Sequence, residues 1–201
     1  HMAGVDVVPF LTFVMITTYT PGPNTVSSAS MGLISGYWKT LPYLMGITTG
    51  LMMIMVVCGN LSGFLVSIIP SLSFWLRMAG STYIMWMAYK TLKISYSFDT
   101  IPDDRLRSAF IKGMSLQMLN PKVIICGITI YTTFLSPIIT NPLWILLSAL
   151  CLSINACIAN SLWALFGSAI RKYVSDPRIC GIINFCLSLL LVYSAISILR
   201  I

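Results

Sequence analysis

Two short proline-centred segments carry the residue types best suited to binding a small polar solute. Proline removes a backbone donor and clashes with the preceding helical turn, so each segment should interrupt a helix. A helix that restarts after a break exposes unpaired amides that favour an anion, while the carbonyls freed upstream favour an ammonium group. A zwitterionic amino acid carries both charges. The predicted substrate-binding residues are Thr20, Pro21, Gly22, Pro23, Asn24 and Thr25 in the first break, and Gln117, Asn120, Pro121 and Lys122 in or one turn before the second.

We expect an asparagine to cap the restarting helix at each break, Asn24 at the first and Asn120, followed by Pro121, at the second. Lys122 lies about 15 Å beyond Lys112 along a continuous helix. If these segments cross a membrane, this places it deep in the bilayer and leaves three alternatives open for its ammonium group. It binds the substrate carboxylate, it acts as a latch whose charge state follows the working cycle of a transporter, or it snorkels to the cytoplasmic membrane interface.

Three further polar residues in or beside apolar segments are candidates for the site. Asn155 and Asn160 are amides that either bind the ligand or hydrogen-bond a neighbouring helix. Asp6 is the only carboxylate at the edge of an apolar segment. It is a candidate for proton coupling, and the alternative is a solvated residue at the start of a helix.

The composition predicts an all-α integral membrane protein. The 201 residues are 57% hydrophobic and 8% charged, with a mean hydropathy of +0.90, which leaves too little polar surface to cover a soluble globule. Each spanning helix needs roughly 20 apolar residues. We predict six transmembrane helices near residues 4–36, 41–62, 74–92, 109–135, 143–169 and 179–199.

The basic residues predict the orientation of the chain. Lys39, the segment from Lys90 to Arg107, and the segment from Arg171 to Arg178 fall on one side if the spans alternate. By the positive-inside rule this side is cytoplasmic, so both termini lie outside. The net charge of +7 thus sets orientation in the lipid bilayer, and no nucleic acid partner is expected.

The polar segment 95–108 divides the chain into two similar halves. We predict a first three-helix repeat over 1–94, a cytoplasmic linker over 95–108, and a second three-helix repeat over 109–201, all in one membrane domain. Since each half has three spans, the repeats are inverted, and the broken helices are spans one and four. Phe10 precedes Pro21 by the same interval as Phe110 precedes Pro121.

Other function classes find less support. A cation or metal-ion transporter or channel remains the alternative, although clusters of carboxylates or thiolates are missing and the six cysteines are scattered. An intramembrane enzyme would lack acid–base machinery, because the only histidine is His1 and no acidic pair lies in a span. We predict no catalytic residue, no metal site and no cofactor. A structural subunit would leave two matching breaks unexplained.

The motifs resemble those of the LysE/RhtB family of amino-acid exporters. Residues 21–50, with PGPN followed by Gly32, Gly36, Gly46 and Gly50, are similar to the first family signature, and FIKGMSLQMLNPK at 110–122 is similar to the second. The resemblance extends over essentially the whole chain. It implies a bacterial inner-membrane secondary transporter that exports amino acids or close derivatives by alternating access, driven by proton antiport, with the PGPN and NPK residues at its functional core.

No acidic residue is predicted in the membrane interior, since Asp6 lies at the outer edge of the first span. This favours neutral amino acids, because a cationic side chain would have no buried counter-charge. The glycine pairs Gly32/Gly36 and Gly46/Gly50 have the spacing that lets helix backbones approach closely. Such contacts fit packing within one chain or between copies in a homo-oligomer, and both alternatives stay open.

Overall fold

The structure is a computed structural model that describes residues 6–93, 105–173 and 177–200. These residues form helices joined by short turns, and no strand occurs among them. The α-helices are α1 (Val7–Tyr19), α2 (Pro23–Ser35), α3 (Tyr37–Asn60), α4 (Ser62–Leu92), α5 (Arg105–Met118), α6 (Pro121–Thr129), α7 (Pro142–Ile170) and α8 (Pro177–Arg200), and the π-helix Ile130–Phe134 and the 3₁₀ turn Arg171–Tyr173 complete the set.

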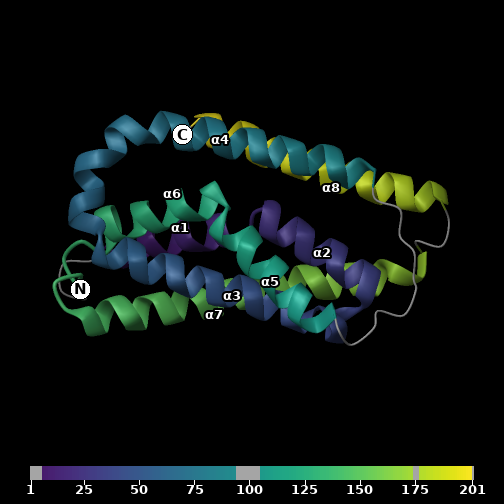
Figure 1. Ribbon diagram of the computed structural model, residues 1–201, viewed down its shortest axis with the longest axis horizontal. Helices are drawn as coiled ribbons and strands as arrows, with labels where there is room; N and C mark the ends of the chain where they lie inside the picture. The colour runs from purple at the N-terminus through teal and green to yellow at the C-terminus, as the bar shows by residue number, and fades with distance from the viewer. Residues whose placement is uncertain (1–5, 94–104, 174–176, 201) are drawn as a thin grey trace.

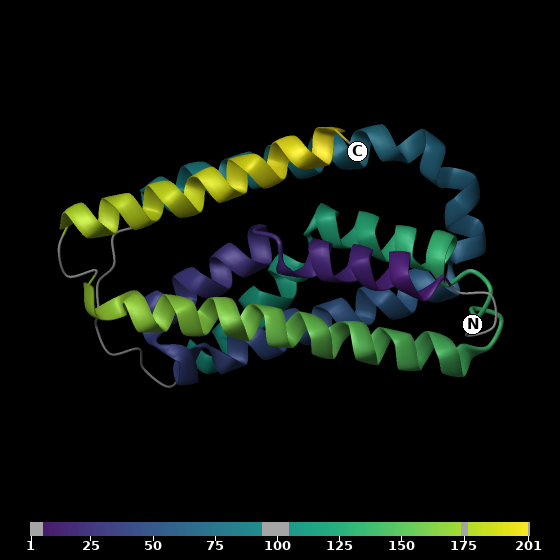
Figure 2. The same cartoon turned by 180° about the vertical axis from the view of Figure 1, so that it is seen from behind.

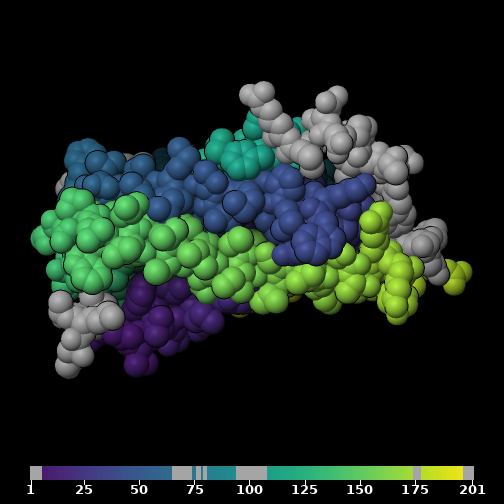
Figure 3. Space-filling model, turned by 90° about the horizontal axis from the view of Figure 1, so that it is seen from below, coloured from purple at the N-terminus to yellow at the C-terminus, as the bar shows by residue number. Residues whose placement is uncertain are grey.

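The helices form an elongated bundle in which α4 and α8 run side by side as a separate pair (Figure 1). The view from behind shows the same pair lying over the remaining helices (Figure 2). In the remaining group, α3 packs against α5 and α7, and α2 packs against α7. From below, α3 and α7 lie side by side along one face, and α1 accompanies only one end of α7 (Figure 3).

The helices have the apolar surface that a lipid environment requires. Among the described residues, Tyr37–Asn60, Pro142–Tyr173 and Arg178–Ile196 are long and apolar enough to cross a membrane, and Val7–Tyr19 and Pro121–Phe134 are shorter apolar helices. Large apolar side chains such as Trp75 and Leu162 are exposed. This confirms an all-helical fold with several apolar helices, as expected of a membrane protein.

Two predicted boundaries were wrong. The connection expected at 63–73 is part of α4, which begins directly after Leu61. The segment is uncharged, and in an apolar environment a helix satisfies its own backbone groups where a loop would not. Residues 95–104 of the predicted linker 95–108 lie outside the described residues. The last four residues of the linker, 105–108, form the first turn of α5.

The segment 109–135, predicted as one broken span, contains a feature that the sequence does not predict. Its last turn, Ile130–Phe134, is a π-helix. The Phe134 ring lies 5.2 Å from the Phe13 ring and 6.0 Å from the Phe10 ring, centroid to centroid. The π turn thus places an aromatic contact between α1 and the end of the second broken helix.

Glycines bring helix backbones into contact in one half of the bundle. A Cβ atom on Gly32 would lie 2.0 Å from the carbonyl oxygen of Ala164, and one on Gly167 would lie 1.9 Å from that of Ala29. These reciprocal contacts form what we call the α2–α7 seam. Gly46 of α3 and Gly113 of α5 make a similar pair of contacts, at 2.1 Å and 2.2 Å from the carbonyl oxygens of Phe110 and Tyr43.

Gly36 and Gly50, which were also predicted to let helix backbones approach closely, have other surroundings. Gly36 has a φ of 77° and links α2 to α3, so its role is a backbone conformation that favours glycine. A Cβ atom on Gly50 would lie 3.0 Å from the Gln117 side chain and 3.2 Å from the carbonyl oxygen of Met114, so this glycine packs against α5 less tightly than Gly46 does. The two glycine contacts in the opposite half, at Gly59 and Gly127, also meet side chains. Close backbone contact is therefore concentrated at the end of the bundle where α2 meets α3.

Candidate functional site

The first helix break is present where the sequence predicts it. Helix α1 ends at Tyr19, Thr20 is extended, and α2 restarts at Pro23. The cap of α2 is Gly22 and not Asn24, because the helix begins at Pro23 and moves Asn24 inside the first turn. The Thr25 hydroxyl accepts a hydrogen bond from the Gly22 amide at 2.8 Å. The Asn24 side chain is therefore free to face the centre of the protein.

Gly22 gives the Lys122 side chain room, and its backbone angles do not need a glycine. Its φ of −166° is extended and open to any residue. A Cβ atom at this position would lie 3.2 Å from the Lys122 Nζ atom and 3.7 Å from the Ser194 hydroxyl oxygen. The first break thus leaves room for the lysine of the second.

The second break confirms its predicted cap. The Asn120 side-chain oxygen accepts a hydrogen bond from the Lys122 amide at 3.1 Å, and Pro121 is the first residue of α6. Asn120 is 1% exposed. A buried cap holds the orientation of the half-helix start as well as stabilising it.

Three amide side chains join the two breaks, and we call them the amide chain. The Asn120 Nδ2 atom donates to Asn24 Oδ1 at 3.0 Å, and Asn24 Nδ2 donates to Gln117 Oε1. Gln117 is fully buried, and its Nε2 atom has no partner. Because an unpaired buried donor is costly, this group is suited to donate to a ligand.

The Lys122 side chain points into the first break. Its Nζ atom donates to the carbonyl oxygen of Thr20 at 3.4 Å. Of the three alternatives for Lys122, snorkelling to the interface does not describe this conformation, because the Thr20 carbonyl freed at the first break holds the ammonium group beside Gly22. The only acidic side chain in the described part of the chain is Asp6, at the start of α1.

Of the remaining predicted site residues, one lines the central cavity and two do not. Asn160 lines the central cavity, where its Oδ1 atom accepts from Ser28 at 3.2 Å and its Nδ2 atom donates to Ala156 at 2.8 Å. Asn155 accepts from the Tyr19 hydroxyl at 3.4 Å and does not line the cavity. Asp6 is exposed and is not brought to the site.

The two breaks enclose a cavity of about 80 Å³. Polar groups gather at the breaks, and the wall away from the breaks is mainly apolar. The lining residues are Thr20, Gly22, Pro23, Asn24, Thr25, Gln117, Asn120, Lys122 and Asn160 at or near the breaks, and Val14, Thr17, Thr18, Leu51, Met55, Val123, Cys126, Ile130, Leu152 and Ala156 elsewhere. The cavity can hold a small zwitterion with a short side chain.

Sequence reasoning missed the apolar wall and the hydroxyl groups that support it. Ser28 follows the break by one helical turn, so its inward position could have been read from helical spacing. Cys126 shares the face of α6 with Lys122 for the same reason. Leu51, Met55 and Leu152 carry no such signal, since any apolar residue in a spanning helix looks alike.

Known proteins match this chain along nearly its whole length. The family model described as LysE type translocator matches residues 15–200. The chain belongs to the LysE type translocator family. This confirms the predicted family and places the chain among multi-pass inner-membrane transporters and not among enzymes.

Curated relatives of this LysE-type translocator are efflux proteins. The chain is 31% identical over 190 residues to the cysteine/O-acetylserine efflux protein of Klebsiella pneumoniae, covering 94% of each chain. It is 30% identical over 196 residues to that of Salmonella paratyphi A and over 189 residues to that of Escherichia coli O157:H7, covering 94% of this chain and 95% of each relative. No solved structure gives a significant match.

Proposed function

We propose that this LysE-type translocator exports small neutral amino acids or their close derivatives from the cytoplasm. The observation that carries the proposal is the pairing of Lys122 and Gln117 in one cavity. Lys122 supplies an ammonium group with no described carboxylate beside it, and Gln117 supplies an unpaired donor, so both suit a substrate carboxylate. The Thr20 carbonyl suits the substrate ammonium group.

The wall of the cavity supports a short, uncharged side chain. Leu51, Met55 and Leu152 offer apolar contact, and Cys126 and Met55 add polarisable sulfur. A cationic substrate would be repelled by the Lys122 ammonium group, and no described acidic side chain lines the cavity to offset this repulsion. Cysteine and O-acetylserine, which name the relatives, both have small neutral side chains and fit this lining.

We also propose the six-span arrangement with both termini outside. The start of α3 and the ends of α4 and α7 lie at the end of the bundle opposite to the start of α1 (Figure 1). Lys39, Lys90 and Arg171 belong to or directly follow these helix ends, which supports a cytoplasmic position for the basic end. The halves 1–94 and 109–201 each supply a broken helix, α1–α2 and α5–α6, followed by two long helices. The pairing of α3 with α7 and of α4 with α8 supports an inverted repeat.

The glycine seams support alternating access. They join backbones at the basic end, while the cavity extends from the breaks toward the opposite end, along α1 and α6. The described conformation is thus closed toward the cytoplasm and looser toward the outside. Asp6 is remote from the cavity, so we assign any coupling to protons to Lys122, which is the charged side chain in the cavity wall.

The first test of this proposal is efflux of a panel of labelled amino acids from preloaded proteoliposomes. We expect cysteine, O-acetylserine or another small neutral amino acid to leave faster than lysine or tryptophan, and an imposed proton gradient to accelerate the efflux. Empty liposomes and the Asn120→Ala variant are the controls. Equal leakage of all compounds, or flux of metal ions alone, would overturn the proposal.

Replacing Lys122 with methionine is expected to abolish amino-acid efflux without unfolding the protein. Methionine keeps the length of the side chain and removes the charge, so the substrate carboxylate loses its partner while the cost of holding an ammonium group inside the protein disappears. Thermal unfolding in detergent should therefore occur at an equal or higher temperature.

The matched control is Lys112→Met, which removes an exposed charge from the preceding half-helix α5. We expect this variant to retain efflux. If Lys122→Met transports like the unaltered protein, the carboxylate is bound elsewhere.

A further inference from the structure

We propose that a second cavity, on the face of α2 opposite to the α2–α7 seam, is a cytoplasmic loading site that binds the amino acid by its carboxylate at Lys90. The inference rests on the proposed export function and adds a site to it. The cavity has a volume of about 320 Å³ and lies between α2, α3 and α4. It is distinct from the central cavity, with which it shares no lining residue.

Lys90 gives this second cavity its charge. The residue lies near the end of α4, and its Nζ atom sits 3.9 Å from the centre of the Trp86 ring. No acidic side chain is described at this end of the bundle. A cation held over an aromatic ring is fixed in position while its outer side stays open to an anion. The proposed orientation places it on the cytoplasmic side, where the substrate of an exporter arrives.

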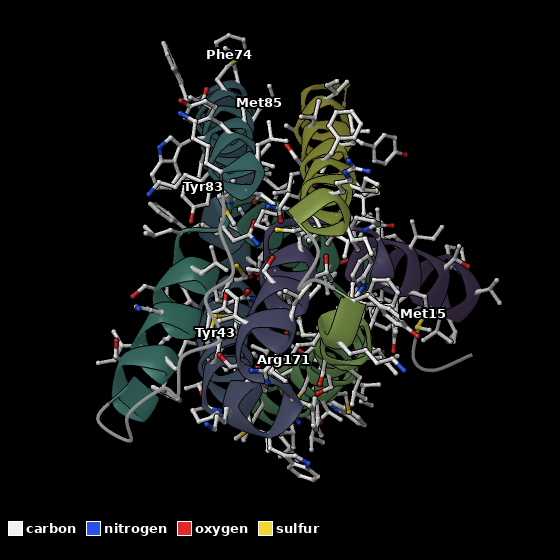
Figure 4. All side chains as sticks on the ribbon, turned by 90° about the vertical axis from the view of Figure 1, so that its right-hand side faces the viewer. Met15, Tyr43, Phe74, Tyr83, Met85 and Arg171 are labelled. Carbon is white, nitrogen blue, oxygen red and sulfur yellow. The ribbon has the colours of Figure 1, made fainter. Side chains whose placement is uncertain are left out.

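Hydroxyl groups make the inner wall of this cavity polar. Ser30 and Tyr43 are 6% and 5% exposed, and both line the cavity together with Ser27 and Tyr83. Figure 4, which looks along the bundle from the basic end, shows Tyr83 on α4 and Tyr43 on α3 on the same side of α2. A lipid acyl chain makes no hydrogen bond to such groups, whereas the ammonium group of an amino acid can donate hydrogen bonds to the hydroxyl oxygens.

Ser27, in the wall of the second cavity, is hydrogen-bonded to the backbone of Asn24, whose side chain lines the central cavity. The Ser27 hydroxyl donates to the backbone carbonyl of Asn24 at 3.0 Å and lies 2.6 Å from the Tyr43 hydroxyl. Asn24 belongs to the amide chain of the central site. The first turns of α2 therefore separate two cavities that both suit a zwitterion, and a movement of α2 away from α7 would change both at once.

The size and lining of the cavity favour a small zwitterion with an apolar or neutral side chain. Met31, Met87 and Trp86 provide the apolar contact. With its carboxylate at Lys90 and its ammonium group at the hydroxyls, an amino acid would be selected here for the same properties that the central cavity requires. The site would raise the substrate concentration next to α2 before the central site opens inward.

The test uses everted membrane vesicles, in which labelled substrate added outside reaches the cytoplasmic face. We expect Lys90→Gln to raise the KM for uptake about three- to tenfold with little change in the maximal rate, as loss of one partly exposed charge contact would do. The matched control is Lys93→Gln, which removes an equal charge from the residue that caps the end of α4. The Lys93 side chain contacts Tyr89 and does not line the cavity.

A second measurement reads occupancy directly. Met31→Cys places a thiol in the cavity wall, and its rate of labelling by a maleimide is measured at that residue by mass spectrometry. In the Met31→Cys variant, which keeps Lys90, substrate is expected to slow this labelling. In the double variant Met31→Cys with Lys90→Gln, a higher substrate concentration should be needed for the same slowing. Labelling that substrate leaves unchanged would overturn the loading site.

The outcomes separate this proposal from the export function and from lipid binding. If the unaltered protein moves no amino acid, export itself fails. If it moves amino acids and Lys90→Gln behaves like Lys93→Gln, only the loading site fails. Vesicles of phosphatidylcholine with and without phosphatidylglycerol supply the last comparison: an effect of Lys90→Gln confined to the anionic vesicles would identify a lipid headgroup as the occupant and overturn the assignment to substrate.

Discussion

Asn120→Ala is expected to lower amino-acid efflux by about a hundredfold or more, because one side chain sets the geometry of both helix breaks. Its oxygen caps α6 at the Lys122 amide, and its nitrogen donates to Asn24 of the other break. Alanine removes both bonds and leaves the Asn24 oxygen without this donor in a buried position. Substrate efflux from proteoliposomes, normalised to the amount of inserted protein, measures the effect.

Asn141→Ala provides a matched control for the capping role. Asn141 also precedes a proline at a helix start, and its oxygen accepts from the Leu143 amide at 2.9 Å. It is exposed at the start of α7 and makes no contact with the cavity. Both variants lose a cap worth about 1 kcal/mol. If both transport equally well, the link between the two breaks has no function.

The two helix breaks were predictable because their cause is local. Pro21, Pro23 and Pro121 remove donors wherever they stand in a helix, and asparagine before proline is a helix-start signal. The partners of these residues were not predictable. Asn24 and Gln117 are 93 positions apart, and the contact between them follows from how the two half-helices meet. The capping residue of α2 was mispredicted because the helix begins at Pro23, so that Gly22 is the cap and Asn24 lies inside the first turn.

The glycine spacing illustrates the same limit. The sequence shows that Gly32, Gly36, Gly46 and Gly50 can admit a close neighbour, but a glycine does not specify which neighbour. The structure assigns Ala164 to Gly32 and Phe110 to Gly46, and it gives Gly36 a turn conformation instead. Large apolar residues that face lipid and those that face protein look alike in the sequence, so their neighbours are known only from the structure.

The position of the seams ties packing to function. Contacts between backbones tolerate no added atoms, so a seam is either closed or opened by a displacement of a whole helix. The α2–α7 seam involves the helix that carries Asn24 and Thr25 at its start, and its opening would move these residues relative to Lys122. The substrate site and the seam therefore belong to one moving element in the proposed transport cycle.

Gly32→Ala is expected to destabilise the closed seam by about 2 kcal/mol or more and to reduce transport strongly. The new Cβ atom would lie 2.0 Å from the carbonyl oxygen of Ala164, and since that oxygen belongs to a helix backbone it cannot turn away as a side chain would. Helix α2 must shift from α7. We expect a lower unfolding temperature in detergent and slower labelling of Met31→Cys, because α2 moves into the second cavity, whose wall contains Met31.

The reciprocal glycine sharpens this prediction. Gly167→Ala should have a similar effect, and the double variant should cost less than the sum of the two, because the first substitution already separates the helices that the second would push apart. Gly63→Ala is the control: Gly63 is exposed in α4 with no atom near its added Cβ, so alanine should leave transport unchanged and stabilise the helix slightly. Equal stability of all three single variants would show that the seam is not closed in the membrane, and the assignment of the described conformation to the cytoplasm-closed state would then be wrong.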